Sequence, residues 1–140
     1  MKTRYIIIVI VLTGLISSGF FCSSVSRSGK MGDQFYSYLQ NDDYNSIIEM
    51  LDEEALAKYS KKEWIQMFTS RNMYLGSLKS YKNTGFHTNT SNGLQIAKLS
   101  YEVDNRNGLV YEEIEFIKRG ASYKIFTYRF APDLAALKGD

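Results

Sequence analysis

Three short joints that contain glycine constrain the fold of the second half of the chain. They hold Asn92-Gly93, Asn107-Gly108 and Arg119-Gly120. They separate four stretches, at about 78–88, 94–104, 109–118 and 122–131. Asn-Gly supplies the positive φ values that tight hairpins need. Because connections this short join antiparallel neighbours, the sequence predicts a four-stranded antiparallel meander.

Alternation of apolar and polar residues supports these strands. In the second stretch the apolar residues are Ala97, Leu99, Tyr101 and Val103, and the residues between them are Lys98, Ser100, Glu102 and Asp104. This is the pattern of a half-buried strand. In the third stretch one face holds Val110, Ile114 and Phe116, and the other holds Tyr111, Glu113 and Glu115.

Helical spacing precedes the strands. One set is Phe35, Tyr36 and Leu39, and a second, after a break with Asp42 or Asp43 as N-cap, is Tyr44, Ile47, Ile48 and Leu51. Ser60 and Glu63 fit a capping box, and a stripe through Trp64, Ile65, Phe68 and Leu75 ends at Gly76. The spacing predicts a helix over 61–75, and helices that lead into a curved antiparallel sheet make an α+β domain.

The N-terminus has the order of a secretory signal. Lys2 and Arg4 are followed by an apolar run from Tyr5 to Ile16 and then by small residues. Extended to Cys22, the run approaches the length of a membrane span. We therefore interpret 1–22 as a signal peptide or membrane anchor, 23–32 as a flexible tether and 33–140 as one domain.

Cys22 is the only cysteine, and it ends the apolar stretch. This arrangement resembles the lipobox of bacterial lipoproteins, whose cysteine is lipidated, although Phe20 and Phe21 precede it where the lipobox has a small residue. Cleavage after Ser24-Val25-Ser26 and a retained anchor are the alternatives. All three predict an exported domain at the cell envelope, anchored to the membrane or free outside the cytoplasm.

Charge and length exclude some classes of function. Lys2 and Arg4 lie in the leader, so the rest of the chain has 15 basic residues against 15 acidic ones. A nucleic-acid partner is not expected, because it needs a positive excess on one face. About 110 residues after the leader suffice for one core.

The order of elements resembles the nuclear transport factor 2-like superfamily, in which helices cap a strongly bent, cone-shaped sheet, as in cystatin-like folds. Trp64, Arg71, Leu75-Gly76, Tyr101, Glu113 and the run from Tyr123 to Tyr128 are similar to a group of small secreted bacterial domains of unknown function. The resemblance covers residues 33–131. It implies a fold, and it lends no reaction.

Residues that could carry catalysis are few. His87 is the only histidine, and enzymes of this superfamily often use a His or Asp inside the cone. Glu113 and Glu115 share a strand face, so they could act as acid and base or form a solvent-facing strip paired with Lys98, Lys118 or Lys124. No phosphate-binding loop or nucleophile motif is present, so no cofactor is expected.

Other polar groups have structural interpretations beside functional ones. A calcium site is conceivable at Asp42, Asp43, Asp52, Glu53 and Glu54, but they lack a calcium-loop spacing and suit helix starts. No zinc ligand set exists. Arg71, two turns after Trp64, would meet an anionic ligand or Glu113, or tie its helix to the sheet by an ion pair. A set of tyrosines lines a pocket or simply forms the core: Tyr74, Tyr81, Tyr101, Tyr111, Tyr123 and Tyr128.

The leading hypothesis is a non-enzymatic envelope domain that binds a protein partner or a small apolar ligand through the concave face of its sheet. One alternative is a small periplasmic enzyme that uses His87 or the Glu113/Glu115 pair inside the cone. A second alternative is an anchored component of a secretion or envelope assembly.

Overall fold

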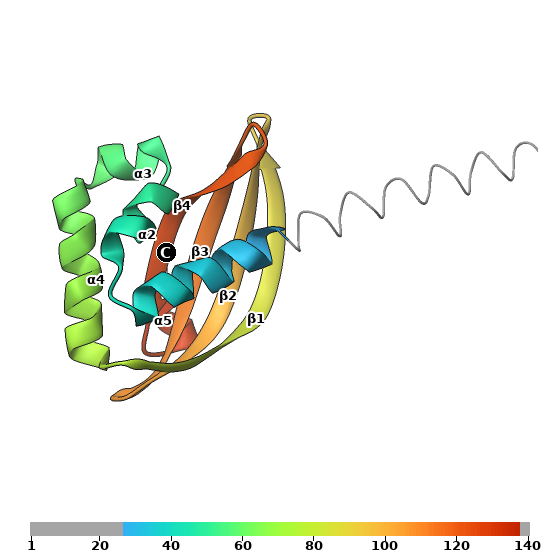
Figure 1. Ribbon diagram of the computed structural model, residues 1–140. Helices are drawn as coiled ribbons and strands as arrows, with labels where there is room; N and C mark the ends of the chain where they lie inside the picture. The colour runs from blue at the N-terminus through green and yellow to red at the C-terminus, as the bar shows by residue number, and fades with distance from the viewer. Residues whose placement is uncertain (1–26, 138–140) are drawn as a thin grey trace, which may run out of the picture.

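Helices cover one face of a four-stranded antiparallel sheet in the computed structural model, which describes residues 27–137 (Figure 1). Residues 27–40 are helical, and the helices that follow are α2 (Tyr44–Met50), α3 (Glu53–Lys58) and α4 (Lys61–Leu75). The strands are β1 (Leu78–Ser91), β2 (Leu94–Asn105), β3 (Gly108–Arg119) and β4 (Ser122–Ala131), with a short helix α5 (Leu134–Leu137) after them. The strand order β1-β2-β3-β4 confirms the predicted α+β meander.

Two of the three hairpin joints carry the expected turn backbone, whereas at the joint between β2 and β3 Asn107 is not among the residues with positive φ and Gly108 has φ 149°. Asn92 and Gly93 have φ values of 51° and 78°, and Gly120 has 61°. The capping box at the start of α4 is also present: the Glu63 carboxylate accepts from the Ser60 N–H at 2.7 Å, and the Ser60 hydroxyl accepts from the Glu63 N–H at 3.3 Å. The predicted helix over 61–75 is confirmed.

The end of α4 is joined to the turn between β2 and β3. Gly76 ends the helix with φ 76°, and a Cβ there would lie 2.8 Å from the Arg106 Cβ. The Arg106 N–H donates to the Ser77 carbonyl and the Asn107 N–H to the Leu75 carbonyl, each at 2.9 Å. This close approach holds the last turns of α4 against the end of the sheet.

The first helix corrects the predicted tether over 23–32, because its described part, 27–32, is helical and packed. Ser28 and Gly32 are buried, and a Cβ on Gly32 would overlap the Tyr101 hydroxyl. Small residues one turn apart let the helix approach the sheet closely. The same residues gave this segment the small, polar composition of a flexible tether, which is why the sequence predicted one. The leader, Cys22 and residues 23–26 lie outside the described residues.

The two faces of the sheet differ in what covers them. The helix-covered face contributes Ala97, Leu99, Tyr101, Val103, Val110, Ile114 and Phe116 to the core, all at most 4% exposed. The opposite face, here called the open face, carries α5 at one corner. At the edges of the sheet, β1 pairs with β2 alone among residues 27–137, whereas β4 also meets Leu51, and the Asp52 N–H donates to the Ile125 carbonyl.

The helix-covered face of the sheet is filled by side chains from the helices. Phe35, Tyr36 and Phe68 from the helices are fully buried against it. Neither α3 nor α5 was predicted, since six and four residues are too short to show periodicity. Within residues 27–137 no helix has the length and apolarity needed to cross a membrane.

Candidate functional site

A closed cluster of polar side chains lies between α4, the first helix and the sheet. This buried cluster consists of Tyr36, Arg71, Asn105, Glu112 and Tyr128, each at most 6% exposed. The Arg71 Nε donates to the Glu112 Oε1 and to the Tyr128 hydroxyl, at 2.9 Å in each case, and its Nη2 also contacts the Glu112 Oε1. The Tyr36 hydroxyl donates to the Glu112 Oε2 at 3.0 Å.

The positions of Arg71 and Glu112 follow from the periods of their elements. Arg71 continues the buried stripe of Trp64 and Phe68 along α4, and Glu112 lies between Val110 and Ile114 on the helix-covered face. Of the two expectations for Arg71, the ion pair that ties its helix to the sheet is present, and its partner is Glu112. The other expectation, a contact with Glu113, is not met, because Glu113 points to the open face. The two-residue period of β3 would have identified Glu112, which sequence reasoning did not consider.

The remaining donors of Arg71 are also satisfied. Its Nη2 donates to the Asn105 Oδ1 at 3.3 Å and its Nη1 to the Asn72 Oδ1 at 2.9 Å. The Asn72 amide in turn donates to the Asp42 carboxylate at 2.8 Å and to the Leu39 carbonyl at 3.3 Å. The guanidinium thus connects α4 to the sheet and, through Asn72, to the end of the first helix.

Burial sets the protonation of the cluster. It raises the pKa of the Glu112 carboxyl, and the contact with Arg71 opposes that rise. Burial, and then the charge of Glu112, raise the pKa of Tyr36 and of Tyr128 well above the usual value, so both phenols stay neutral. Because every member is enclosed, the cluster cannot reach a substrate, and its chemistry is that of a structural ion pair with satisfied neighbours.

The aromatic candidates divide between the core and the surface. Trp64 donates from its Nε1 to the Ala55 carbonyl at 3.1 Å, and its ring stacks on Phe68 with centroids 5.8 Å apart. Tyr101 packs edge-on against Tyr36, and burial raises its pKa to about 12. The other predicted tyrosines are Tyr81, which stacks on Tyr36, Tyr123, which is buried, Tyr111, which is half-buried on the open face, and Tyr74, which is 79% exposed.

The proposed catalytic side chains lie on the open face and outside the helix-covered interior. Glu113 has ion pairs with Lys98, at 3.6 Å, and with Arg129, at 2.7 Å. His87 is exposed, and it and Glu115 both lie opposite Lys98 in the strand register. The structure therefore places all three residues away from the helix-covered interior.

Acidic residues near α2 and α3 are engaged by partners within the domain. Asp43 and Asp52 cap the two helices, and Asp52 also accepts two hydrogen bonds from Arg119, each at 2.9 Å. Asp42 accepts from the Tyr44 hydroxyl at 2.7 Å. Within the described part of the chain, no three or more His, Cys, Asp or Glu residues are grouped so that they could hold a metal.

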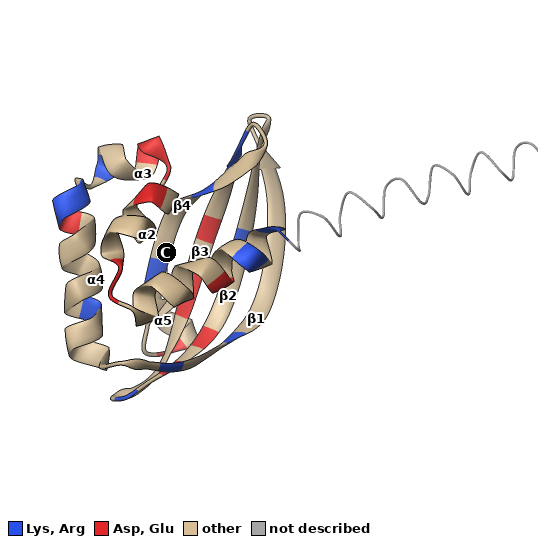
Figure 2. Cartoon of the chain, in the orientation of Figure 1, with Lys and Arg blue, Asp and Glu red and all other residues tan. Residues whose placement is uncertain are grey.

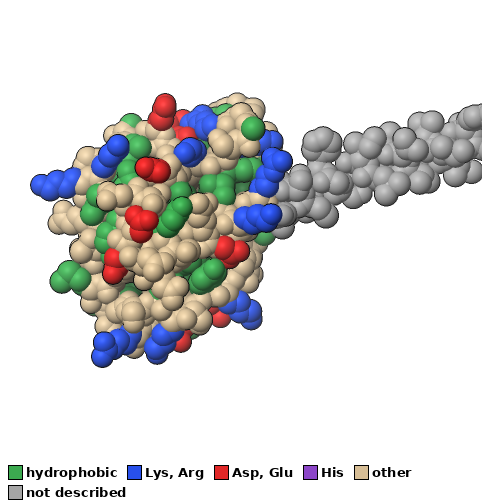
Figure 3. All heavy atoms as spheres, in the orientation of Figure 1, with side chains coloured by type: hydrophobic (Ala, Val, Ile, Leu, Met, Phe, Trp, Pro, Cys, Tyr) green, Lys and Arg blue, Asp and Glu red, His purple; other side chains and the backbone are tan. Residues whose placement is uncertain are grey.

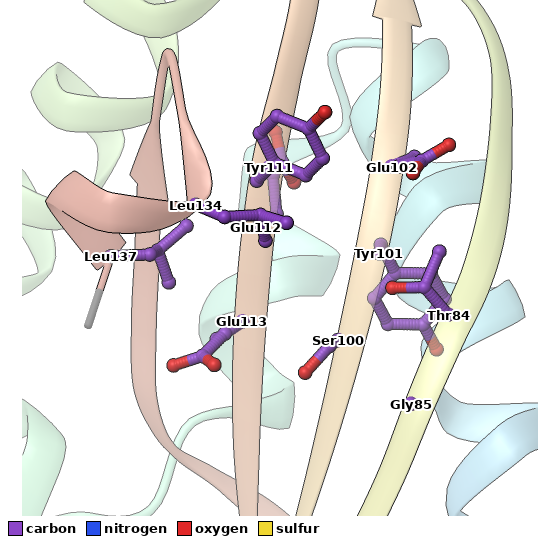
Figure 4. Close-up of a pocket in the computed structure, with 10 residues that line it drawn as sticks. All are labelled: Thr84, Gly85, Ser100, Tyr101, Glu102, Tyr111, Glu112, Glu113, Leu134 and Leu137. Atoms are coloured by element: carbon purple, nitrogen blue, oxygen red, sulfur yellow. The ribbon is translucent and has the colours of Figure 1, made fainter.

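A groove of about 270 Å³ opens on the open face (Figure 4). Its lining comes from β1, β2, β3 and α5, and consists of Thr84, Gly85, Ser100, Tyr101, Glu102, Tyr111, Glu112, Glu113, Leu134 and Leu137. Gly85, Ser100, Glu113 and Arg129 follow one another across the strand register. The lining of this groove includes three of the predicted residues, Tyr101, Tyr111 and Glu113. The groove itself could not be predicted from the sequence, because α5 forms one of its walls.

Charges of both signs are spread over the helices and strands (Figure 2). On the side of the molecule seen in Figure 3, acidic, basic and hydrophobic side chains are interspersed.

No protein-family model matches this chain, and no curated protein matches it. The chain is similar to the solved structure titled "Structure of Bdellovibrio bacteriovorus Bd1075", with a TM-score of 0.54 and 16% sequence identity. The match covers 75% of this chain and 39% of that chain, so this chain spans well under half the length of its structural neighbour. At this level of identity the similarity shows an α+β fold in common and nothing further.

Proposed function

We propose that this chain is an exported, non-enzymatic envelope domain that binds an extended segment of a partner protein. One observation carries the proposal: the interior is closed, while the open-face groove reaches β1, which is an edge strand. We further propose that the sheet belongs to the cone-shaped, nuclear transport factor 2-like type. If the protein is instead an anchored component of a secretion or envelope assembly, it would bind its neighbours through the same surface, β1 and the open-face groove.

The edge strand supports a polypeptide partner. β1 has 14 residues, and among residues 27–137 only β2 pairs with it. Its outer edge offers backbone groups to an added strand, which is a recurrent mode of peptide recognition. Thr84 and Gly85 belong both to this strand and to the groove, so a strand added there would lie beside the groove.

The leader supports the location. An apolar run between Lys2-Thr3-Arg4 and Cys22 has the order of an export signal, with lipidation, cleavage and a retained anchor as its three outcomes. Only four residues separate Cys22 from the first described helix. A fully extended chain gains at most about 3.5 Å per residue, so a lipidated Cys22 would hold the domain within about 20 Å of the bilayer.

Crosslinking in living cells tests both the proposed location and the proposed binding surface. A photo-reactive residue is placed at Thr84 or Glu102 of the full chain, and at the exposed Lys61 on α4 as the control. We expect the chain in the membrane or periplasmic fraction and one polypeptide adduct shared by Thr84 and Glu102 but absent from Lys61. Recovery of the chain with its leader intact in the cytosol refutes the location, and equal or absent adducts at all three positions refute the binding surface.

A further inference from the structure

We infer that the open-face groove receives a lysine or arginine side chain of the bound polypeptide, with Glu102 as its counter-charge. This inference rests on the proposed function and specifies the partner at the same site. Three features of the groove carry it: a hollow on its floor, an unpaired carboxylate and an apolar wall.

The floor of the groove is hollow because Gly85 and Ser100 lie opposite each other on β1 and β2. Gly85 is not among the residues with positive φ, and a Cβ there would lie 3.5 Å from the Ser100 Cβ, an ordinary contact. Neither backbone strain nor crowding therefore requires glycine at this position. Its effect is to leave open a space that a side chain on the edge strand would otherwise cover.

The lining carries negative charge without a basic residue of its own. The Glu112 side chain points to the helix-covered face, where it is bound to Arg71, and Glu113 is neutralised by Lys98 and Arg129. Glu102 is half-buried, and no residue within 27–137 makes a hydrogen bond or ion pair with its carboxylate. A half-buried carboxylate without a partner is an attractive site for a cation.

Lys82 is the basic residue on β1 that could interact with Glu102 if its side chain moved. Lys82 is opposite Glu102 in the register of β1 and β2, but it is exposed and not within ion-pair distance. Removing the charge of Lys82 should therefore leave Glu102 more available to a ligand.

The wall of the groove suits the stem of a long basic side chain. Leu134 and Leu137 of α5 border it, and Tyr111 lies between them and the strands of the floor (Figure 4). Lysine and arginine bury their methylene groups against apolar surface while the charged end meets a polar group. A volume of about 270 Å³ is also small for a drug-sized ligand and suits one side chain.

The edge strand would deliver such a side chain in the right direction. Residues directly opposite each other on antiparallel strands place their side chains on the same face. A residue of the partner opposite Gly85 would therefore project onto the open face, and with no side chain at Gly85 it could fold across β1 toward Ser100 and Glu102.

Peptide binding to the full chain in detergent micelles tests the inference. The probes are short acetylated peptides of alternating threonine and valine with a central lysine, arginine, norleucine or glutamate, measured by fluorescence anisotropy. We expect the lysine and arginine peptides to bind at least about fivefold more tightly than the norleucine peptide, with the glutamate peptide weakest. Added salt should reduce the difference.

Variants identify the group responsible. Glu102→Gln should bring the lysine and norleucine peptides to within about twofold, Lys82→Gln should increase the preference, and Gly85→Leu should weaken all binding. Glu115→Gln, on the same face but outside the groove, is the control and should change nothing. Circular dichroism melting checks that each variant is folded.

The outcomes separate this inference from the proposed function. If all four peptides bind equally well, or if Glu102→Gln keeps the preference for lysine, the basic side chain is refuted and a polypeptide-binding edge stands. If no peptide binds, the inference is refuted, and the crosslinks from Thr84 decide the proposed function independently.

Discussion

Arg71 and Glu112 form an ion pair that is enclosed on all sides, with the Arg71 Nε 2.9 Å from the Glu112 Oε1. The other oxygen of Glu112 accepts from Tyr36, so one residue of β3 connects α4 and the first helix to the sheet. A buried pair of this kind adds little net stability compared with apolar residues, but the loss of one partner leaves a buried charge uncompensated. Its main effect is to set how the helices sit on the sheet.

Removal of Arg71 should therefore be strongly destabilising. We expect Arg71→Ala to lower the free energy of unfolding by about 3–5 kcal/mol, because Glu112 would stay buried without its counter-charge. Urea denaturation measures the loss. The double variant Arg71→Met with Glu112→Leu should recover most of it, since it removes both charges and keeps the volume. An unchanged melting temperature in Arg71→Ala would show that the ion pair does not hold α4 on the sheet.

The close approach of the first helix to the sheet gives a matched pair of substitutions. A Cβ on Gly32 would overlap the Tyr101 hydroxyl, whereas nothing lies within 4 Å of a Cβ on Gly29. Gly32→Ala should cost about 1–3 kcal/mol through overpacking, while Gly29→Ala should gain up to about 1 kcal/mol from helix propensity. Thermal melts of the two variants compare them directly.

A second substitution checks the cause of the Gly32 effect. Tyr101→Phe removes the hydroxyl that the new methyl group would meet, so it should restore part of the stability lost in Gly32→Ala. Equal melting temperatures for Gly29→Ala and Gly32→Ala would contradict the tight packing of residues 27–32.

The Asp52–Arg119 pair should make stability depend on pH. Hydrogen bonds from Arg119 lower the pKa of the Asp52 carboxyl. A depressed pKa stabilises the protein above the pKa of the unfolded chain, near 4, and this stabilisation is lost as pH falls through the lower folded-state pKa. We expect the difference in unfolding free energy between the protein and Asp52→Asn to shrink as pH falls from about 5 to about 2.5.

Asparagine suits this test because it caps helices as well as aspartate does, which leaves the charge as the variable. Glu49→Gln, an exposed site, is the control and should show no such trend. Urea denaturation at a series of pH values gives both curves. A difference that grows toward acid would show that Asp52 is not stabilised as a carboxylate.

Trp64 should be one of the most costly core residues to truncate. It is 5% exposed, stacks on Phe68 and donates to the Ala55 carbonyl. Trp64→Ala should cost about 3–5 kcal/mol, and Trp64→Phe, which keeps an aromatic ring but loses the donor, should cost less. Tyr74→Ala, at a position 79% exposed, should change stability by no more than about 0.5 kcal/mol. A cost below about 1 kcal/mol for Trp64→Ala would refute its core position.

Local signals in the sequence predicted the architecture well. The capping box at Ser60, the glycine after Leu75 and the Asn-Gly turn at 92–93 act within a few residues, so helix 61–75 and the meander could be read directly. The first helix was harder to predict, because a small residue, Gly32, allows its contact with Tyr101. The need for a small residue there is evident only once the position of the sheet is known.

The candidate site was predicted only in part. Tyr101, Tyr111 and Glu113 were predicted as candidates, but the groove depends on α5, a helix of four residues without a sequence signature. The ion pair between Arg71 and the sheet was expected, but the one acidic residue considered for Arg71 was Glu113, one position from Glu112, which in a strand means the opposite face. Counting by two from Val110 reaches Glu112 and excludes Glu113.

The meander has a consequence for the order in which the chain can acquire its structure. In the described part of the chain the four strands pair with one another in the order of the sequence, so each hairpin can close as soon as its two strands have been synthesised. The first helix is synthesised before the sheet, but the hydrogen-bond partner of Tyr36, Glu112, is synthesised 76 residues later. The apolar side of the first helix therefore stays exposed to solvent until β3 has been synthesised. A nascent chain halted before β3 should accordingly bind chaperones more strongly than the complete chain.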